Sequence, residues 1–200
     1  MMKRIRLLIL IMLVAITSTG LAACSGGSSS SSTKDTLADR ELSDMSGYEG
    51  LEEYDKDTVF VDMTVKEMDE MMKNGETFVV FFSFENCPYC NRLIPYLNDA
   101  ALEAGRRVAY INTRANPEWE NNMDIDDYDI VEERFAKWLP EDDDGREHLY
   151  VPDVYFIKNG KVVARHDGVT PGADDPSNKL TSEQLEQLKK DLADEFNSLN

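Results

Sequence analysis

The chain has 200 residues, of which 42% are hydrophobic and 30% are charged. These values are typical of one globular domain with additional segments. The formal net charge of −18 excludes nucleic acid as a partner and argues against membrane attachment through a basic patch, because phosphates and anionic lipids would be repelled.

The N-terminus has the layout of a signal peptide. Lys3, Arg4 and Arg6 precede ten uninterrupted apolar residues, 7–16, and small residues follow. The alternative is a transmembrane anchor, but ten residues fall short of the roughly 20 that span a bilayer as a helix. Removing residues 1–23 leaves 18 basic against 39 acidic residues, a net charge of −21.

The segment Leu21-Ala22-Ala23-Cys24 resembles the lipobox of bacterial lipoproteins. This resemblance implies cleavage before Cys24, lipidation of its sulfur and anchoring in the cell membrane at the extracytoplasmic face. More than one acyl chain holds a protein to a bilayer far better than a single chain does. An unmodified free thiol is the alternative.

Residues 24–57 are predicted to connect this anchor to the folded domain. The Ser/Gly-rich run 25–32 is typical of a flexible tether. The acidic stretch 34–57 has few large apolar residues, which indicates a linker or poorly ordered arm, with Leu51 and Tyr54 as docking positions.

The domain is predicted to span residues 58–200. Residues 59–63 predict a short strand, and Thr64 with Glu67 forms a capping box that opens a helix. The apolar face of that helix carries Val65, Met68, Met71 and Met72, and Gly75 ends it. Residues 77–84 are almost all apolar and β-prone, which predicts a central strand covered on both faces.

A second helix is predicted from Pro88, with Pro95 as a kink and Gly105 as its end. Residues 107–112 predict the next strand. The alternation of strands and helices indicates a parallel α/β core. Residues 151–165 predict an antiparallel hairpin around Asn159-Gly160. The final helix begins with a Thr181 and Gln184 capping box, and its apolar stripe is formed by Leu185, Leu188, Leu192 and Phe196.

An acidic segment, about residues 113–149, separates the third strand from the hairpin. Within it, one helical face is indicated by Val131, Phe135, Trp138 and Leu139. The acidic clusters lack the ligand spacing of a calcium-binding EF-hand loop, so we expect solvated surface and no metal site there.

Cys87 and Cys90 lie where a strand leads into a helix, three positions apart. Cys87 precedes the first turn, where unpaired backbone N–H groups and the helix dipole favour a thiolate. We therefore expect Cys87 to attack disulfides and Cys90 to resolve the mixed disulfide. One alternative is half a zinc site completed by His148 and His166, whose spacing matches no common zinc pattern. The other is a structural disulfide, which would stabilise little across so short a loop.

The order of the elements, with CPYC at 87–90, the kinking Pro95, the Val151-Pro152 strand start, the Asn-Gly hairpin and a C-terminal helix, resembles the thioredoxin-fold superfamily. The similarity is greatest to thioredoxin-like lipoproteins and bacteriocin transport accessory proteins of Gram-positive bacteria. CPYC is also the glutaredoxin dithiol. The resemblance implies a three-layer α/β/α sandwich with a mixed sheet, in which residues 113–149 are an insertion.

The resemblance also implies residue roles. Pro88 and Tyr89 would tune the redox potential, Pro152 would be a cis-proline facing the dithiol, and Val151 would pair with substrate backbone. Phe81 stands where thioredoxins have a buried acid, so the proton acceptor for Cys90 is missing or relocated. Glu85 is a candidate replacement acting through water. The Gly-Gly pair of glutaredoxins after the hairpin is absent, which weakens a glutathione site.

Three functions follow as hypotheses. The first is a protein-disulfide oxidoreductase that uses the Cys87–Cys90 disulfide without any added cofactor. Its partners would be the thiols and disulfides of exported proteins, a membrane redox partner and the lipid bilayer. The second is a non-enzymatic accessory or peptide-binding module. The third is a thiolate carrier of a metal such as copper(I).

Overall fold

A computed structural model describes residues 35–51, 58–114, 123–168, 172–173 and 175–200. These residues belong to one compact unit, 31–200. The predicted signal peptide, the lipobox with Cys24, the Ser/Gly-rich run and Tyr54 lie outside the described residues. Within those ranges, no helix has both the length and the apolar character needed to cross a membrane.

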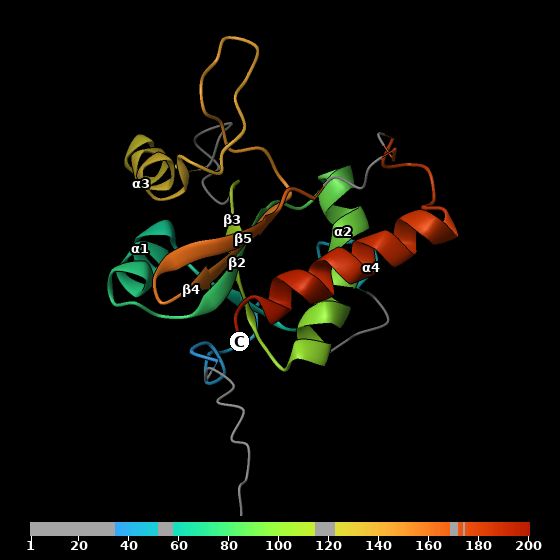
Figure 1. The fold of residues 1–200 in the computed structure, drawn as a ribbon, viewed down its shortest axis with the longest axis horizontal. Helices are drawn as coiled ribbons and strands as arrows, with labels where there is room; N and C mark the ends of the chain where they lie inside the picture. The colour runs from blue at the N-terminus through green and yellow to red at the C-terminus, as the bar shows by residue number, and fades with distance from the viewer. Residues whose placement is uncertain (1–34, 52–57, 115–122, 169–171, 174) are drawn as a thin grey trace, which may run out of the picture. The chain divides into compact units, whose positions relative to one another are not determined.

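Five strands form one mixed sheet in the order β1-β3-β2-β4-β5 (Figure 1). The strands are β1 (Phe60–Asp62), β2 (Phe78–Ser83), β3 (Val108–Asn112), β4 (Asp153–Lys158) and β5 (Lys161–His166). The first three run parallel, whereas β4 is antiparallel to β2 and β5. The predicted parallel core and C-terminal hairpin are therefore confirmed. At the hairpin turn Asn159 and Gly160 have φ of 52° and 73°, which explains this residue pair.

Among the described residues, four helices cover the sheet, two on each face (Figure 1). They are α1 (Val65–Lys73), α2 (Pro88–Ala104), α3 (Ile125–Phe135) and α4 (Ser182–Asn197). Helices α2 and α4 contribute to one hydrophobic cluster, and α1 and α3 contribute to the other. The result is the three-layer α/β/α arrangement of the thioredoxin-like fold, as the sequence predicts.

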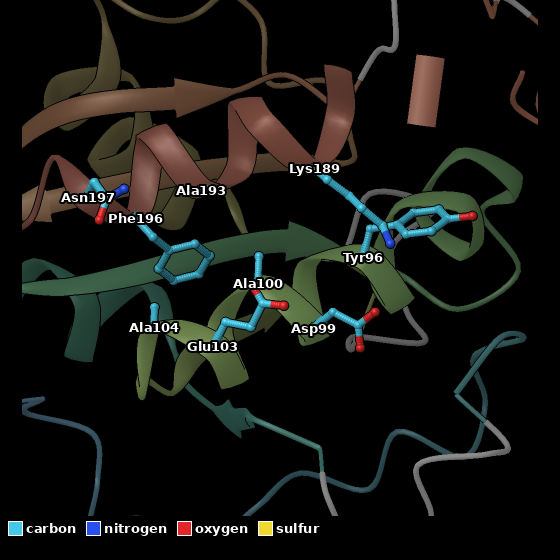
Figure 2. Close-up of a pocket in the computed structure, with 9 residues that line it drawn as sticks. All are labelled: Tyr96, Asp99, Ala100, Glu103, Ala104, Lys189, Ala193, Phe196 and Asn197. Atoms are coloured by element: carbon cyan, nitrogen blue, oxygen red, sulfur yellow. The ribbon is translucent and has the colours of Figure 1, made fainter. Parts of the chain in front are cut away.

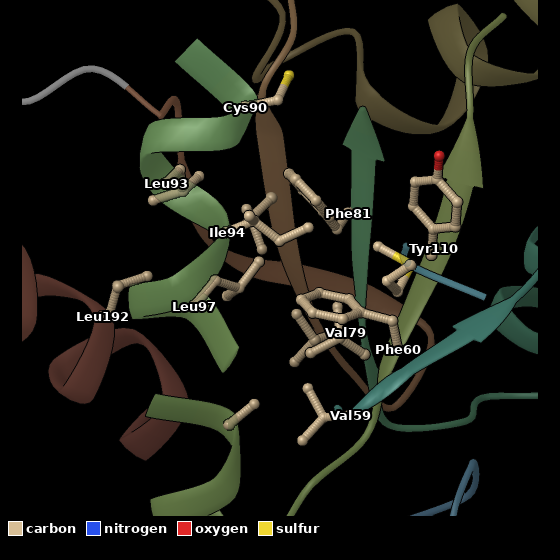
Figure 3. Packing of buried hydrophobic residues seen from close by; sticks show 14 of the residues in the cluster. Val59, Phe60, Val79, Phe81, Cys90, Leu93, Ile94, Leu97, Tyr110 and Leu192 are labelled. Atoms are coloured by element: carbon tan, nitrogen blue, oxygen red, sulfur yellow. The ribbon is translucent and has the colours of Figure 1, made fainter. Parts of the chain in front are cut away.

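Strand β2 shows why the two clusters exist. All six of its residues are buried, because each face is covered by helices. Val79 and Phe81 face α2, where they meet Leu93, Ile94 and Leu97 (Figure 3). The intervening Phe78, Val80 and Phe82 belong to the opposite cluster. The run of apolar residues thus follows from burial on both sides rather than from one amphipathic face.

The helix ends follow the predicted capping signals. Capping boxes are present at Thr64 with Glu67 and at Thr181 with Gln184. Gly105 ends α2 in the left-handed region at φ 63°. One helix prediction is too long, because α3 ends at Phe135 and the chain turns before Leu139, which is nevertheless buried. The buried apolar face therefore extends beyond the last residue of the helix.

The segment 35–51 differs from the predicted linker or poorly ordered arm. Four of its large apolar side chains, Leu37, Met45, Tyr48 and Leu51, are buried against the domain, and Leu42 is partly buried. Hydrogen bonds attach it at several points: Ser43 N donates to Phe60 O at 2.9 Å, and Arg107 N donates to an Asp35 carboxylate oxygen at 2.9 Å. We refer to residues 35–51 as the N-terminal arm. Its few apolar residues pack at both faces of the sheet, which composition alone does not indicate.

Candidate active site

The two cysteines are positioned by the junction between β2 and α2. Cys87 is the N-cap of α2, and Cys90 lies one turn further along, on the helix face that packs on the sheet. Both are free thiols in this structure. Cys87 keeps 4% of its surface exposed, whereas Cys90 keeps 0%. Both residues are buried, and Cys87 is the one that keeps a small exposed remainder.

The surroundings of Cys87 favour its thiolate. The side-chain hydrogen bond with Cys90 contributes most, followed by the backbone N–H groups of Cys90 and Tyr89 and by the positive charge of Arg114; together they lower the pKa of Cys87 to about 7. The distance from Cys90 N to Cys87 Sγ is 3.3 Å. This geometry is the N-terminal thiolate site that the position of the CPYC motif predicts.

A titration of reactivity checks this pKa. Only the thiolate is alkylated, so the rate of Cys87 alkylation by iodoacetamide should rise about tenfold per pH unit below the pKa. It should level off above pH 7, since the pKa of Cys87 is lowered to about 7. Mass spectrometry of the labelled chain assigns the site. A rate that keeps rising beyond about pH 8, as for an ordinary thiol of pKa about 8.5, would contradict the assignment.

Cys90 has the opposite environment. Burial raises its pKa above the ordinary value, and the hydrogen bond with Cys87 acts in the same direction. The hydroxyl of Ser83, at the end of β2, is hydrogen-bonded to the Cys90 sulfur and opposes this rise. Cys90 therefore remains a thiol at neutral pH until a neighbouring group or the reaction itself favours its ionisation.

The segment before β4 lies opposite the dithiol. The Val151–Pro152 peptide bond is cis, as the resemblance to thioredoxins implies. The Cys87 thiol points to the Val151 carbonyl oxygen at 3.9 Å. The next residue, Asp153, is fully buried, and Arg165 and Tyr155 donate to its carboxylate at 2.8 and 2.7 Å. These contacts anchor the strand start that brings Val151 to Cys87.

Sequence reasoning missed Arg114, which follows β3. Its guanidinium lies 3.6 Å from the centre of the Phe84 ring, and its charge acts on Cys87. The carboxyl ends of the parallel strands β2 and β3 meet at one edge of the sheet, so a basic residue after β3 was a detectable signal.

Glu85, the predicted proton relay, is exposed on the loop before Cys87. Its carboxylate lies against Gly47 of the N-terminal arm, where a Cβ would come within 2.2 Å of the Glu85 carboxyl carbon. Its negative charge acts on Tyr110. The structure thus places Glu85 beside the arm and Tyr110. The group bonded to Cys90 from the sheet is Ser83.

The two histidines considered as zinc ligands lie in different surroundings. His148 is exposed and packs its ring edge-on to Tyr150, whereas His166 is buried on β5 and pairs with Glu195 of α4 at 3.2 Å. In the part of the chain that the structure covers, no three His, Cys, Asp or Glu side chains gather closely enough to hold a metal ion.

Three surface pockets are candidate sites for a ligand. A broad groove of about 1050 Å³ borders Pro88, between the N-terminal arm and residues 176–180. A small hollow of about 90 Å³ lies beside Val151, Phe84 and Arg114. A third, of about 240 Å³, lies between α2 and α4 (Figure 2). The described residues that line this third hollow include no cysteine, so no thiol lies there.

Comparisons with known proteins match no family model and no curated protein. Solved structures are matched. One is described as a putative oxidoreductase with a thioredoxin fold, with 15% identity over 66% of this chain and 94% of that chain, at a TM-score of 0.41. Thioredoxin O2 from Arabidopsis thaliana has 15% identity over 66% and 93%, at 0.36. An uncharacterized thioredoxin-like protein from Clostridium perfringens has 19% identity over 72% and 89%, at 0.33. The fold of this chain is therefore assigned from its own strand order and helix placement.

Proposed function

We propose that the chain is a membrane-tethered thiol–disulfide oxidoreductase that acts on exported proteins at the extracytoplasmic face. The observation that carries this proposal is the asymmetry of the two thiols. Cys87, at the N-terminus of α2, has a pKa lowered to about 7, whereas Cys90, with 0% of its surface exposed, has a raised pKa. A nucleophilic thiol followed by a resolving thiol is the requirement for exchange through a mixed disulfide.

The surface around the dithiol suits a protein substrate. Tyr89 and Tyr150 are among the few large apolar side chains that are exposed, at 37% and 52%, and each is next in sequence to a residue of the site. Aromatic side chains are enriched where proteins recognise one another. The Val151 carbonyl, beside Cys87, offers an acceptor for the backbone N–H of an extended substrate segment.

The location belongs to the proposal as well. The lipobox at Leu21 to Cys24, the preceding apolar run and the Ser/Gly-rich run support a lipid-anchored domain held off the membrane. They also support a place among the thioredoxin-like lipoproteins of Gram-positive bacteria. A dithiol in that compartment needs a membrane redox partner to restore its working state after each exchange. No added cofactor is required, because the Cys87–Cys90 pair is itself the redox centre.

The test is catalysis of insulin reduction by dithiothreitol. We expect the full-length chain to accelerate precipitation of the insulin B chain, and the Cys87→Ser, Cys90→Ser double variant to give the uncatalysed rate. Equal rates for the two proteins would contradict the proposal and favour an accessory module. Copper(I) retained in one-to-one ratio by the wild-type chain, without acceleration, would favour a metal carrier.

A further inference from the structure

A chain of buried hydroxyl groups leads from the dithiol to the N-terminal arm. The Ser83 hydroxyl is near enough to the Cys90 sulfur to oppose, through a hydrogen bond, the rise in the pKa of that thiol. The Tyr48 hydroxyl donates to Ser83 Oγ at 2.8 Å, and the Tyr48 and Tyr110 oxygens are 3.0 Å apart. All three residues are buried, with 0% of Ser83, 3% of Tyr48 and 5% of Tyr110 exposed.

A phenol has one hydroxyl proton, so Tyr48 donates to one of its two neighbours, Ser83 or Tyr110, at a time. In the arrangement in which Tyr48 donates to Ser83, Tyr110 can donate to Tyr48, and the Ser83 proton is free to point at Cys90. All three donors are then aligned toward one sulfur. Hydrogen bonds in such a series polarise one another and strengthen in a buried environment.

The hydroxyl chain lies on the same face of β2 as Phe81. Side chains alternate along a strand, so Ser83 and Phe81 project from the same face, toward α2. Figure 3 shows Phe81 packed between α2 and Tyr110, whose hydroxyl points to the end of the sheet where Cys90 lies. On this face of β2 the polar side chain is Ser83, whereas Phe81, two positions earlier, belongs to the hydrophobic cluster.

We infer that the hydroxyls of Ser83, Tyr48 and Tyr110 stabilise the thiolate of Cys90 during the resolving step. Ser83 touches the reacting sulfur and is a catalytic residue in this sense, while Tyr48 and Tyr110 position its proton. The inference rests on the proposed function, since it concerns the second half of the exchange reaction. It also gives the N-terminal arm a part in the chemistry.

The reaction step balances without any further reactant. Cys90 Sγ, as a thiolate, attacks the Cys87 sulfur of the mixed disulfide. The Cys87–Cys90 bond forms, the bond between Cys87 and the substrate sulfur breaks, and the substrate leaves as a thiolate. The proton given up by Cys90 ends on the substrate thiol. The hydroxyl chain supplies hydrogen bonds to the transient anion and returns to its starting state.

The arm holds Tyr48 firmly enough for this role. Tyr48 packs edge-on against Tyr110, with ring centres 5.9 Å apart. The backbone N–H of Tyr48 donates to Met45 O at 3.0 Å, and the backbone N–H of the next residue, Glu49, donates to Asn91 Oδ1 of α2 at 3.1 Å. The arm is thus fixed directly to the helix that carries the dithiol.

The two halves of the exchange can be timed separately with dithiobis(nitrobenzoate). One equivalent releases a first coloured thiolate when Cys87 attacks and a second when Cys90 resolves the adduct. The full-length chain is used, with Cys24→Ser in every sample so that only the dithiol reacts. The variants are Ser83→Ala and Tyr48→Phe, with Ser43→Ala as the matched control. The buried Ser43 hydroxyl has no partner among the described residues.

We expect Ser83→Ala to leave the first release unchanged and to slow the second by about 10- to 100-fold, the size of one lost hydrogen bond to a charged group. Tyr48→Phe should slow the second release less, and Ser43→Ala should match the parent. The pH at which the second rate levels off should also move upward in Ser83→Ala. The titratable groups facing Cys90 are Cys87, Tyr48 and Tyr110, with the charges of Glu85 and Asp62 acting on Tyr110.

Three results would overturn the inference. A second release at the parental rate in both variants would show that the hydroxyls do not act on Cys90. Equal slowing of both releases would show that they only support packing. A parent chain that gives no first release would remove the proposed function, and with it this inference, whereas the first two results leave the proposed function standing.

Discussion

Replacing Cys87 by serine is expected to reduce disulfide exchange to the uncatalysed rate, even though Cys90 remains. A serine hydroxyl does not form an anion near neutral pH, so the nucleophile is lost outright. Cys90 cannot substitute for it, because its surface is 0% exposed and burial raises its pKa. Loss of a catalytic nucleophile costs orders of magnitude in rate, far more than loss of any single hydrogen bond in this site.

The measurement is the single-turnover reduction of a disulfide-containing peptide, followed by separation of its oxidised and reduced forms. Cys24→Ser is the matched control, since it removes the remaining cysteine of the chain and should leave the rate unchanged. A Cys87→Ser chain that still reduces the peptide faster than buffer would show that Cys90 attacks directly, and the order of the two thiols would have to be reversed.

Replacing Cys90 by serine is expected to have a different and equally large effect. Cys87 keeps its backbone N–H donors from residues 89 and 90, so the first attack proceeds. The mixed disulfide then has no internal thiol to resolve it. We expect a covalent complex with the substrate that persists until a reductant is added.

In cells, this variant also reports the natural partners. Gel separation without reductant should show the chain joined to exported proteins, and mass spectrometry identifies them. The double variant Cys87→Ser, Cys90→Ser is the control and should trap none. If Cys90→Ser formed no adduct while wild-type exchange persisted, the resolving role of Cys90 would be wrong. Replacing Cys90 by alanine, which leaves no side-chain donor, should in addition raise the pKa of Cys87 from about 7, because the hydrogen bond with Cys90 contributes most to that value.

The fold was predictable because its signals are local. Capping residues such as Thr64 and Thr181, the apolar run of β2 and the Asn159-Gly160 turn each specify an element within a few residues. The alternation of strands and helices then leaves few topologies. The position of Cys87 at a helix N-terminus follows from the same signals, and with it the direction of its pKa shift.

The groups around Cys90 were not predictable in the same way. Tyr48 lies 35 positions from Ser83 and 62 from Tyr110, and nothing in the local pattern of the arm marks it as buried. Only about one residue in four of the arm is apolar and large enough to dock, a composition that resembles a linker. The departure at Phe81 indicated that a polar group was missing from its usual place. Where the replacement lay depended on tertiary packing.

The most direct test of the central claim is to mix the reduced wild-type chain with one equivalent of an oxidised protein substrate and to map the products. The account predicts that the chain loses two hydrogen atoms, that a disulfide links Cys87 to Cys90, and that the substrate gains two thiols in equal amount. A substrate that stays oxidised while Cys87 and Cys90 remain free thiols would contradict it.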